Sequence, residues 1–371
     1  MSEYIGDGQR QYSGISSILR IDAKIFIAIL LITLLGLLTI YSSSSGDLSL
    51  VIKQATRIVI GVITMIFIAQ VHPDNLRLFA PFLYFVTFIL LTIVLFFGVG
   101  NTADRWLDLY FFRFQPSELM KIFVPLMVAY YYSNKPLPPK LAYLFIASLI
   151  VLIPVLMIMK QPDLGTALLI GMSGAIAILL AGISLKFFLG SSLTIILLAP
   201  VLWMNMHAYQ KQRVLTFFDP ESDPMGAGYH LLQSKIALGS GGFFGKGLFN
   251  GTQSKLGFVP EHSTDFIFSA FGEEFGFLGV LLLLSLYLFI ALRGLSISVK
   301  ATDNFGRILS GTLSLTLFLY VIVNVGMVIG FLPVVGAPLP FMSYGGTSMV
   351  TLFATVGIIM SIKSHQRILR K

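Results

Sequence analysis

Long apolar runs separated by short polar segments dominate the hydropathy pattern of the chain. Runs such as "IFIAILLITLLGLL" are apolar on every helical face, whereas a strand of a membrane barrel alternates over about 10 residues. A helix needs about 20 apolar residues to cross a bilayer. The pattern therefore predicts an all-α polytopic membrane protein with ten transmembrane helices, at residues 25–44, 51–70, 79–98, 116–132, 142–159, 164–182, 187–206, 266–292, 306–330 and 345–362.

Composition supports the membrane prediction. The chain is 56% hydrophobic and only 11% charged, whereas about a quarter of the residues in a soluble domain are charged. The net charge of +8 could indicate nucleic acid, but Lys and Arg also collect in the cytoplasmic loops of membrane proteins, so we expect no nucleic-acid partner. The chain has no cysteine, which excludes disulfides and thiolate metal sites.

Charge placement predicts the topology and the domain organisation. With the N-terminus inside, the inner segments hold 14 Lys and Arg residues and the short outer loops hold four, so both termini are expected in the cytoplasm. Residues 1–24 are expected to form a polar cytoplasmic tail without a cleavable signal, and residues 25–371 a single transmembrane domain. No internal repeat is apparent, which weakens a transporter interpretation.

The long segment 207–265, between the seventh and eighth spans, is then a large extracellular loop. Its length favours a function over a plain connector. The stretch "YHLLQSKIAL" is amphipathic enough to lie at the membrane interface. "GSGGFFGKG" departs from a nucleotide-binding loop because Gly247 stands where Ser or Thr is needed, although glycine-rich backbone can still bind anions. His207, His230 and His262 lack a metal-ligand spacing, so no dedicated metal site is expected.

Several charged residues are predicted to lie within or next to spans. Pro116 can begin a helix whose first turn holds Glu118, and Lys121, three residues later, lies on the same face and can form an ion pair with it. This pair could be a structural clamp or part of a site. Arg57 lies inside the second span, where a guanidinium needs a carboxylate or phosphate partner.

Other polar features gather at the same predicted outer side. Asp163, in "KQPDLGTA", and Asp265, in "PEHSTDFIF", could each cap a helix or belong to a site. Residues 330–348, "GFLPVVGAPLPFMSYGGTS", predict an irregular segment, which is tolerated at membrane depth where protein buries it or it lines a cavity. Together these features predict an outward-facing site for an anionic, membrane-borne substrate, although a proton-coupled transporter could show the same ingredients.

From about Ile21 onward, the chain resembles the SEDS family (shape, elongation, division and sporulation proteins). The resemblance rests on "RWLDLYFFRFQPSELMK", "QPDLGTA", "DPESDPMGAGYHLLQSKIALGSGG", "PEHSTDFIF" and "PLPFMSYGGTS", and "GTQSKLGFVPEHSTDFIF" resembles the RodA branch rather than the FtsW branch. It implies a peptidoglycan glycosyltransferase of the bacterial cytoplasmic membrane. Such an enzyme would polymerise lipid II into β-1,4 glycan strands for lateral cell-wall elongation and rod shape, with a class B penicillin-binding protein transpeptidase and the elongation machinery as partners.

The resemblance also implies roles for individual residues. Asp265 matches the essential acidic residue of the family, and our hypothesis makes it the general base. Glu118 and Lys121 match its buried ion pair, and Arg57 lies near a basic residue of the family. Candidates for binding the substrate, including its diphosphate, are Arg57, Lys121, Lys211, Arg213, Glu118 and Asp163, and Mg²⁺ or Mn²⁺ could share that task. A lipid II flippase, or a scaffold for the transpeptidase, remains an alternative.

Overall fold

The structure is a computed structural model that describes residues 20–99, 105–108, 113–183, 208–223, 226–255 and 263–365, together with isolated positions between 189 and 206. Its elements are α2 (Ala23–Ser43), α3 (Leu48–Gln70), α4 (Pro73–Phe97), β1 (Leu107–Asp108), β2 (Arg113–Phe114), α5 (Pro116–Ser133), α6 (Leu141–Lys160), α7 (Leu164–Leu180), α10 (Ala208–Phe218), the 3₁₀ turn η1 (Pro220–Ser222), α11 (Ala227–Ser240), α12 (Thr252–Lys255), α13 (Ile267–Lys300), α14 (Asn304–Ile329) and α15 (Thr347–Ser364).

Most of the expected spans coincide with helices. Nine of the ten fall on α2–α7 and α13–α15, and the seventh, 187–206, lies mostly outside the described residues. Within the described part of the chain, seven helices are long and apolar enough to cross a membrane, and α7 is a shorter apolar helix. The chain is therefore a multi-pass membrane protein. The all-α prediction is wrong in one detail, because β1 and β2 form a small antiparallel hairpin with Leu107 opposite Phe114.

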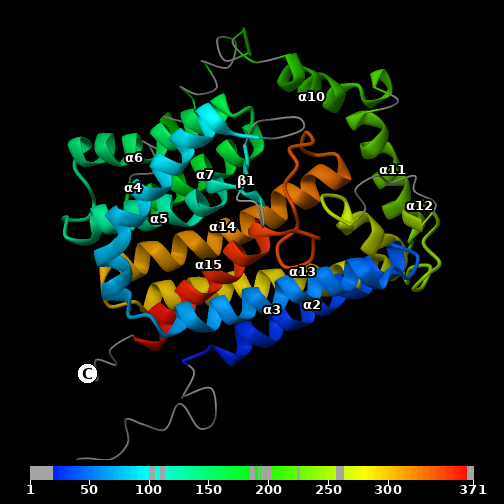
Figure 1. Cartoon of the computed structure of the whole chain (residues 1–371), viewed down its shortest axis with the longest axis horizontal. Helices are drawn as coiled ribbons and strands as arrows, with labels where there is room; N and C mark the ends of the chain where they lie inside the picture. The colour runs from blue at the N-terminus through cyan, green and yellow to red at the C-terminus, as the bar shows by residue number, and fades with distance from the viewer. Residues whose placement is uncertain are drawn as a thin grey trace, which may run out of the picture.

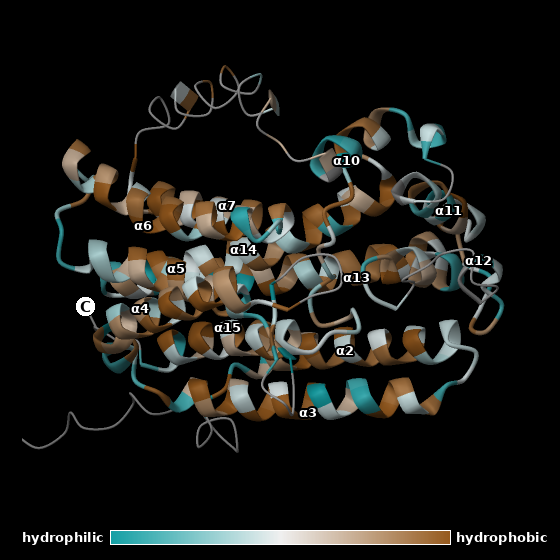
Figure 2. Ribbon diagram, turned by 45° about the horizontal axis from the view of Figure 1, so that its top comes forward, coloured by the Kyte–Doolittle hydropathy of each residue, from teal (hydrophilic) through white to brown (hydrophobic). Residues whose placement is uncertain are grey.

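The helices form two groups that share α14. In one group α3 packs along α15, and α13 packs against both α2 and α14 (Figure 1). In the other, α4–α7 pack on one another, and α5 and α7 contact α14. Apolar residues cover most of these helices, as expected for helices in lipid (Figure 2). The short helices α10 and α11 lie beyond the ends of the long helices, with α11 against α13 and α14.

The eighth expected span differs most from its prediction. Residues 266–292 were expected to be one helix, but α13 continues to Lys300 and is broken at Gly276, where φ is 64° and ψ is −166°. Only glycine adopts this backbone conformation readily. The break divides α13 into a short helix, residues 267–275, and a long apolar helix that begins at Phe277.

A single carboxylate fastens three helices at the end of the bundle opposite the Ser263–Phe266 turn. Asp22 caps α2, where Oδ1 accepts hydrogen bonds from the backbone N–H groups of Lys24 and Ile25. Its Oδ2 lies 3.0 Å from Arg293 Nε of α13 and 2.6 Å from Lys363 Nζ of α15. Burial alone would raise the pKa of Asp22, but Lys363, the Ile25 backbone N–H and Arg293 together outweigh burial and hold that pKa below its usual value.

We expect Asp22→Asn to lower the free energy of unfolding by roughly 3 kcal/mol, the low end of the cost of breaking a buried ion pair. The estimate is at the low end because Arg293 and Lys363 keep 27% and 22% of their side-chain surface exposed. Asn keeps a capping oxygen, so the change isolates the lost charge. Thermal unfolding of the purified protein in detergent measures the effect.

The matched control is Asp74→Asn, because Asp74 pairs with His72 at 3.4 Å on an exposed surface. It should leave the unfolding temperature nearly unchanged.

The pKa of Asp22 is lower in the folded protein than in the unfolded chain, so the contribution of the Asp22 carboxylate to stability is complete at neutral pH. The difference between the parent and Asp22→Asn should therefore shrink as the pH falls below about 4. An undiminished difference at acidic pH would refute this account.

Candidate active site

A cavity of about 440 Å³ opens where the N-terminal ends of α5, α7, α13 and α15 converge. Four stretches that the sequence placed on one side of the membrane, 105–121, 160–167, 207–265 and 330–348, all contribute residues to its wall. The side of the membrane on which they lie stays a prediction. The lining residues are Arg105, Trp106, Gln115, Glu118, Lys121, Asp163, Thr166, Leu169, Thr264, Asp265, Gly336, Ala337, Pro338, Tyr344, Gly345, Gly346, Thr347 and Ser348.

Asp265 stands in the turn that enters α13. The N-cap position of α13 falls on Phe266, one residue later, so Asp265 does not occupy the capping position of that helix. Asn324 Nδ2 of α14 donates hydrogen bonds to the carbonyl oxygens of Asp265, at 2.8 Å, and Ala337, at 2.7 Å. Ser343 Oγ donates to the Thr264 carbonyl at 2.6 Å. Asn324 of α14 and Ser343 of the irregular segment after it therefore hold the backbone that carries the half-buried carboxylate.

The predicted pair between Glu118 and Lys121 forms on α5. Lys121 Nζ lies 2.6 Å from Glu118 Oε1, and the two side chains are 12% and 8% exposed. Thr351 Oγ1 of α15 donates to Glu118 Oε2 at 3.3 Å, and the Lys121 ammonium lies 5.1 Å from the centre of the Tyr320 ring. The pair is thus buried between α5, α14 and α15, but both residues still line the cavity.

Asp163 caps a helix and also lines the cavity. Its Oδ1 accepts the Thr166 backbone N–H at 3.2 Å, which makes it the N-cap of α7, as the helix-cap interpretation expected. Its Oδ2 accepts Gln115 Nε2 at 3.0 Å and lies 3.3 Å from Arg105 Nη1. The side chain is 7% exposed. A capping residue therefore also anchors a cation at the cavity wall.

Sequence reasoning did not assign Arg105 or Gln115 to the site. Both belong to the stretch "RWLDLYFFRFQPSELMK", which was recognised as a cluster. Arg105 reaches the cavity through local pairing: Trp106 bridges to Val99, and β1 pairs with β2. The only sequence signal for this placement was the concentration of charge before the Pro116 helix start.

Arg57 lies beside the cavity rather than in its lining. Its guanidinium carbon stacks over the Tyr344 ring at 4.3 Å, and Tyr344 is a lining residue. Among the described residues, its buried Nη1 has no hydrogen-bond partner. Arg57 was expected to need a carboxylate or phosphate partner, but the contact seen in the described residues is with an aromatic face, and Nη1 keeps donor capacity for an anion.

The other predicted cations do not line this cavity. Lys211 and Arg213 lie on α10, where Lys211 Nζ donates to the Met204 carbonyl at 3.3 Å and Arg213 is exposed. Their assignment to the substrate stays a prediction. His207 and His262 lie outside the described residues. Across the ranges that the structure describes, no group of three or more His, Asp or Glu side chains could hold a metal ion.

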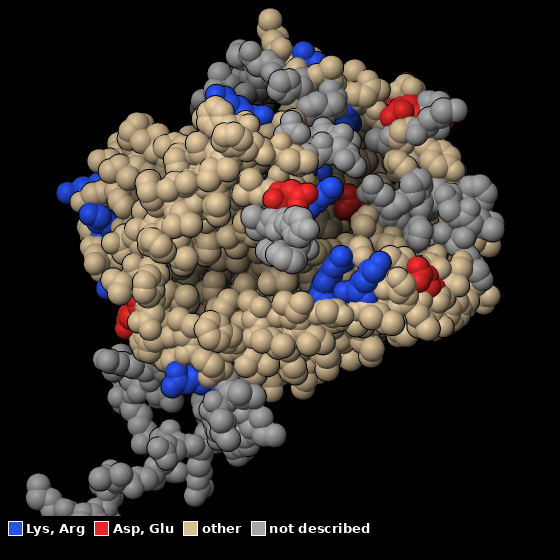
Figure 3. Space-filling view, viewed as in Figure 1, with Lys and Arg blue, Asp and Glu red and all other residues tan. Residues whose placement is uncertain are grey.

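Charged side chains thus converge on one hollow in a largely apolar molecule. Figure 3 shows acidic and basic atoms gathered around a hollow in the middle of the face. Burial keeps the dielectric low and strengthens electrostatic interactions with a bound group. The fold and the cavity define a multi-pass membrane protein with a charged cavity at the ends of its helices.

Comparisons with known proteins identify the family. Residues 22–368 match the family of FtsW, RodA and SpoVE, described as cell cycle proteins. The chain belongs to this family, the SEDS family. It is 45% identical over 353 residues to the peptidoglycan glycosyltransferase MrdB of Escherichia coli K12, covering 95% of each chain. It is 35% identical to a probable peptidoglycan glycosyltransferase FtsW of Trichlorobacter lovleyi, covering 92% of this chain and 93% of the relative.

Solved structures agree with this assignment. A chain of a peptidoglycan synthase complex superposes with a TM-score of 0.81 at 27% identity, covering 93% of this chain and 98% of that chain. The crystal structure of the Thermus thermophilus rod shape determining protein RodA gives a TM-score of 0.71 at 24% identity, covering 93% and 97%. The similarity to RodA, at 24% identity, supports the fold alone.

We expect Glu118→Ala to reduce both the yield of folded protein and its activity. The change leaves the Lys121 ammonium buried without its carboxylate, which typically costs about 3–5 kcal/mol. Size-exclusion chromatography of membrane extracts and thermal unfolding measure the folded fraction. Normal abundance with lost activity would instead indicate that Glu118 acts directly on substrate.

The double variant Glu118→Leu with Lys121→Met tests whether the pair is more than a clamp. Replacing both members of a buried pair by apolar residues of similar size is often neutral for stability. We therefore expect the folded fraction to recover while activity stays lost. Parental activity in this variant would show that the pair has only a structural role.

Proposed function

We propose that this protein is a peptidoglycan glycosyltransferase that polymerises lipid II into β-1,4 glycan strands for cell-wall elongation, with Asp265 as its general base. The observation that carries the proposal is the convergence of Asp265, the Glu118–Lys121 pair and the Asp163–Arg105 pair on one cavity at the helix ends. The relatives named peptidoglycan glycosyltransferases support the reaction class.

The reaction joins a sugar hydroxyl to an anomeric carbon. The acceptor oxygen forms the new bond to that carbon, the bond from the carbon to the diphosphate oxygen breaks, and the electron pair leaves with the diphosphate. Because the donor linkage is α and the product linkage is β, one inverting displacement is sufficient. The Asp265 carboxylate takes the hydroxyl proton as the bond forms, a contribution of roughly 10²–10⁴-fold.

The departing diphosphate needs positive charge. Arg57 supports this role because its Nη1 keeps a free donor next to Tyr344, and Arg105 supports it because it lies at the cavity wall. Lys121 contributes its charge from within the Glu118 pair. Lys211 and Arg213 would act on a substrate that extends beyond the cavity. A divalent cation such as Mg²⁺ or Mn²⁺ would also neutralise the diphosphate when bound.

We place the cavity on the outer side of the bacterial cytoplasmic membrane, with ten spans and both termini in the cytoplasm. The excess of Lys and Arg in the predicted inner segments supports this orientation. The segment 207–265 is then the extracellular loop between the seventh and eighth spans. A class B penicillin-binding protein transpeptidase of the elongation machinery is the proposed partner, and the similarity to a chain of a peptidoglycan synthase complex supports it.

Asp265→Asn is the direct test of the base. Asn keeps the size and a hydrogen-bonding oxygen but cannot take the proton, so we expect glycan polymerisation to fall by at least about 10²-fold. The folded fraction should stay at the parental level, since Asn324 holds Asp265 through its backbone carbonyl. Polymerisation at the parental rate would show that Asp265 is not the base.

The assay uses purified protein and lipid II in detergent, with and without the partner transpeptidase. Detergent removes the two sides of the membrane, so a flippase has no transport to perform there. Glycan polymer that depends on Asp265 supports an enzyme. Absence of polymer in both arms, with intact folded protein, would favour the flippase or scaffold alternative.

A further inference from the structure

The break in α13 is filled by another part of the chain. The glycine segment, residues 241–247, lies against Gly276 so closely that a Cβ on Gly276 would fall 2.2 Å from the backbone nitrogen of Gly245. Conversely, a Cβ on Gly245 would fall 2.1 Å from the carbonyl oxygen of Glu274. Neither position has room for a side chain, so two glycines permit this backbone contact.

Backbone hydrogen bonds join the glycine segment to both sides of the break. They satisfy donors and acceptors that the interrupted helix leaves without partners of its own. The bonds run from Lys246 N to Glu273 O at 3.0 Å, from Gly247 N to Glu274 O at 3.0 Å, from Phe277 N to Gly242 O at 2.9 Å and from Leu278 N to Phe243 O at 3.2 Å.

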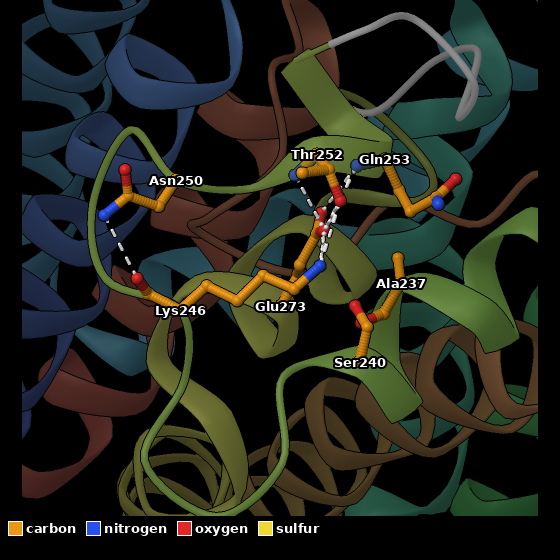
Figure 4. Close-up of polar contacts among 7 residues, drawn as sticks. All are labelled: Ala237, Ser240, Lys246, Asn250, Thr252, Gln253 and Glu273. Atoms are coloured by element: carbon orange, nitrogen blue, oxygen red, sulfur yellow. Dashed lines mark hydrogen bonds and ion pairs between the residues drawn. The ribbon is translucent and has the colours of Figure 1, made fainter.

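The Glu273 side chain adds an ion pair and hydrogen bonds to this junction. Its carboxylate is fully buried and lies 2.8 Å from Lys246 Nζ (Figure 4). Oε1 also accepts the backbone N–H of Thr252 at 2.8 Å, its hydroxyl at 3.0 Å and the backbone N–H of Gln253 at 3.1 Å. Lys246 Nζ donates to Thr252 Oγ1 at 2.9 Å as well. One carboxylate therefore fixes residues 246–253 to the end of the short helix.

The other end of that short helix carries Asp265. Every residue from Ile267 to Glu274 is buried, so the short helix has little freedom to bend or rotate on its own. At its start, Asn324 and Ser343 hold the carbonyls of Asp265 and Thr264. The helix is thus held at both ends, by the α14–α15 segment beside Asp265 and by Glu273 beside Gly276.

We propose that Glu273, with Lys246, is a positioning residue for Asp265: the ion pair sets where the short helix lies and thereby where the carboxylate stands in the cavity. The inference rests on the proposed function, because it concerns the placement of the proposed base. A displacement of about 1 Å in a catalytic group can lower the rate by about 10²-fold. Glu273 lies outside the cavity lining, so its effect on the reaction passes through the helix.

The test compares Glu273→Gln, Lys246→Met and the double variant in the purified full-length chain with lipid II. Gln keeps the shape and one accepting oxygen, so the change removes the charge. We expect kcat to fall about tenfold in each single variant, with KM within roughly twofold of the parent. The kcat of the double variant should be no lower than that of the less active single variant, because both changes remove the same interaction. Lys246→Arg keeps a cation at this position and should therefore retain most of the parental kcat.

A second measurement follows the short helix without any activity. Hydrogen exchange of peptides covering residues 263–275 should rise in Glu273→Gln, both alone and in an Asp265→Asn background. The matched control is Asp22→Asn, which breaks another buried carboxylate–lysine contact at the opposite end of the bundle. That control should lower the unfolding temperature yet leave kcat per folded molecule and exchange over 263–275 unchanged.

The outcomes separate this inference from the proposed function. Parental kcat and parental exchange in Glu273→Gln would overturn the positioning role, whatever Asp265→Asn does. A loss of activity that only follows the folded fraction, or additive losses in the double variant, would also overturn it. An active Asp265→Asn enzyme would instead remove the proposed base, while the exchange data would still report whether Glu273 holds the short helix.

Discussion

The need to satisfy backbone polar groups at membrane depth constrains the whole molecule. A continuous helix satisfies them internally, so any interruption must be buried in protein or face a cavity. Two interruptions in the described part of the chain are each resolved in one of these ways. The break at Gly276 is filled by backbone hydrogen bonds from the glycine segment. The irregular stretch between α14 and α15 is held by Asn324, Ser343 and Gln54, and it forms one wall of the cavity.

These two interruptions lie at opposite ends of the same short helix, which is why they matter for function. A straight span would carry Asp265 on a long helix whose position depends on lipid and on distant packing. The break separates residues 267–275 from the apolar helix that follows. In the proposed mechanism, local contacts set where Asp265 stands, because a general base must be held to within a fraction of an ångström.

Hydropathy and short-range spacing predicted most of the helices and part of the cavity lining. Apolar runs located nine helices, and a separation of three residues was enough to pair Glu118 with Lys121. Contacts between segments far apart in the chain have no comparable pattern in the sequence. Neither the docking of Gly245 into the Gly276 break nor the reach of Arg105 to Asp163 follows from periodicity, because both depend on how separate elements meet. Composition alone allows "GSGGFFGKG" an anion-binding role, and it gives no sign of the close backbone contact that Gly245 makes with α13 in the structure.

The pairing of charges in the cavity explains how the site can be both stable and reactive. Glu118 with Lys121, and Asp163 with Arg105, are two contacts in which opposite charges largely cancel. They give the wall fixed dipoles without a large net field, and the pairing offsets part of the desolvation cost that each charge would carry alone. Asp265 adds negative charge at one wall, and Arg57 adds positive charge behind Tyr344. In the proposed reaction, Asp265 becomes neutral as negative charge grows on the diphosphate. Charge therefore moves away from the carboxylate and toward the cations, and fixed groups stabilise that shift without having to reorganise.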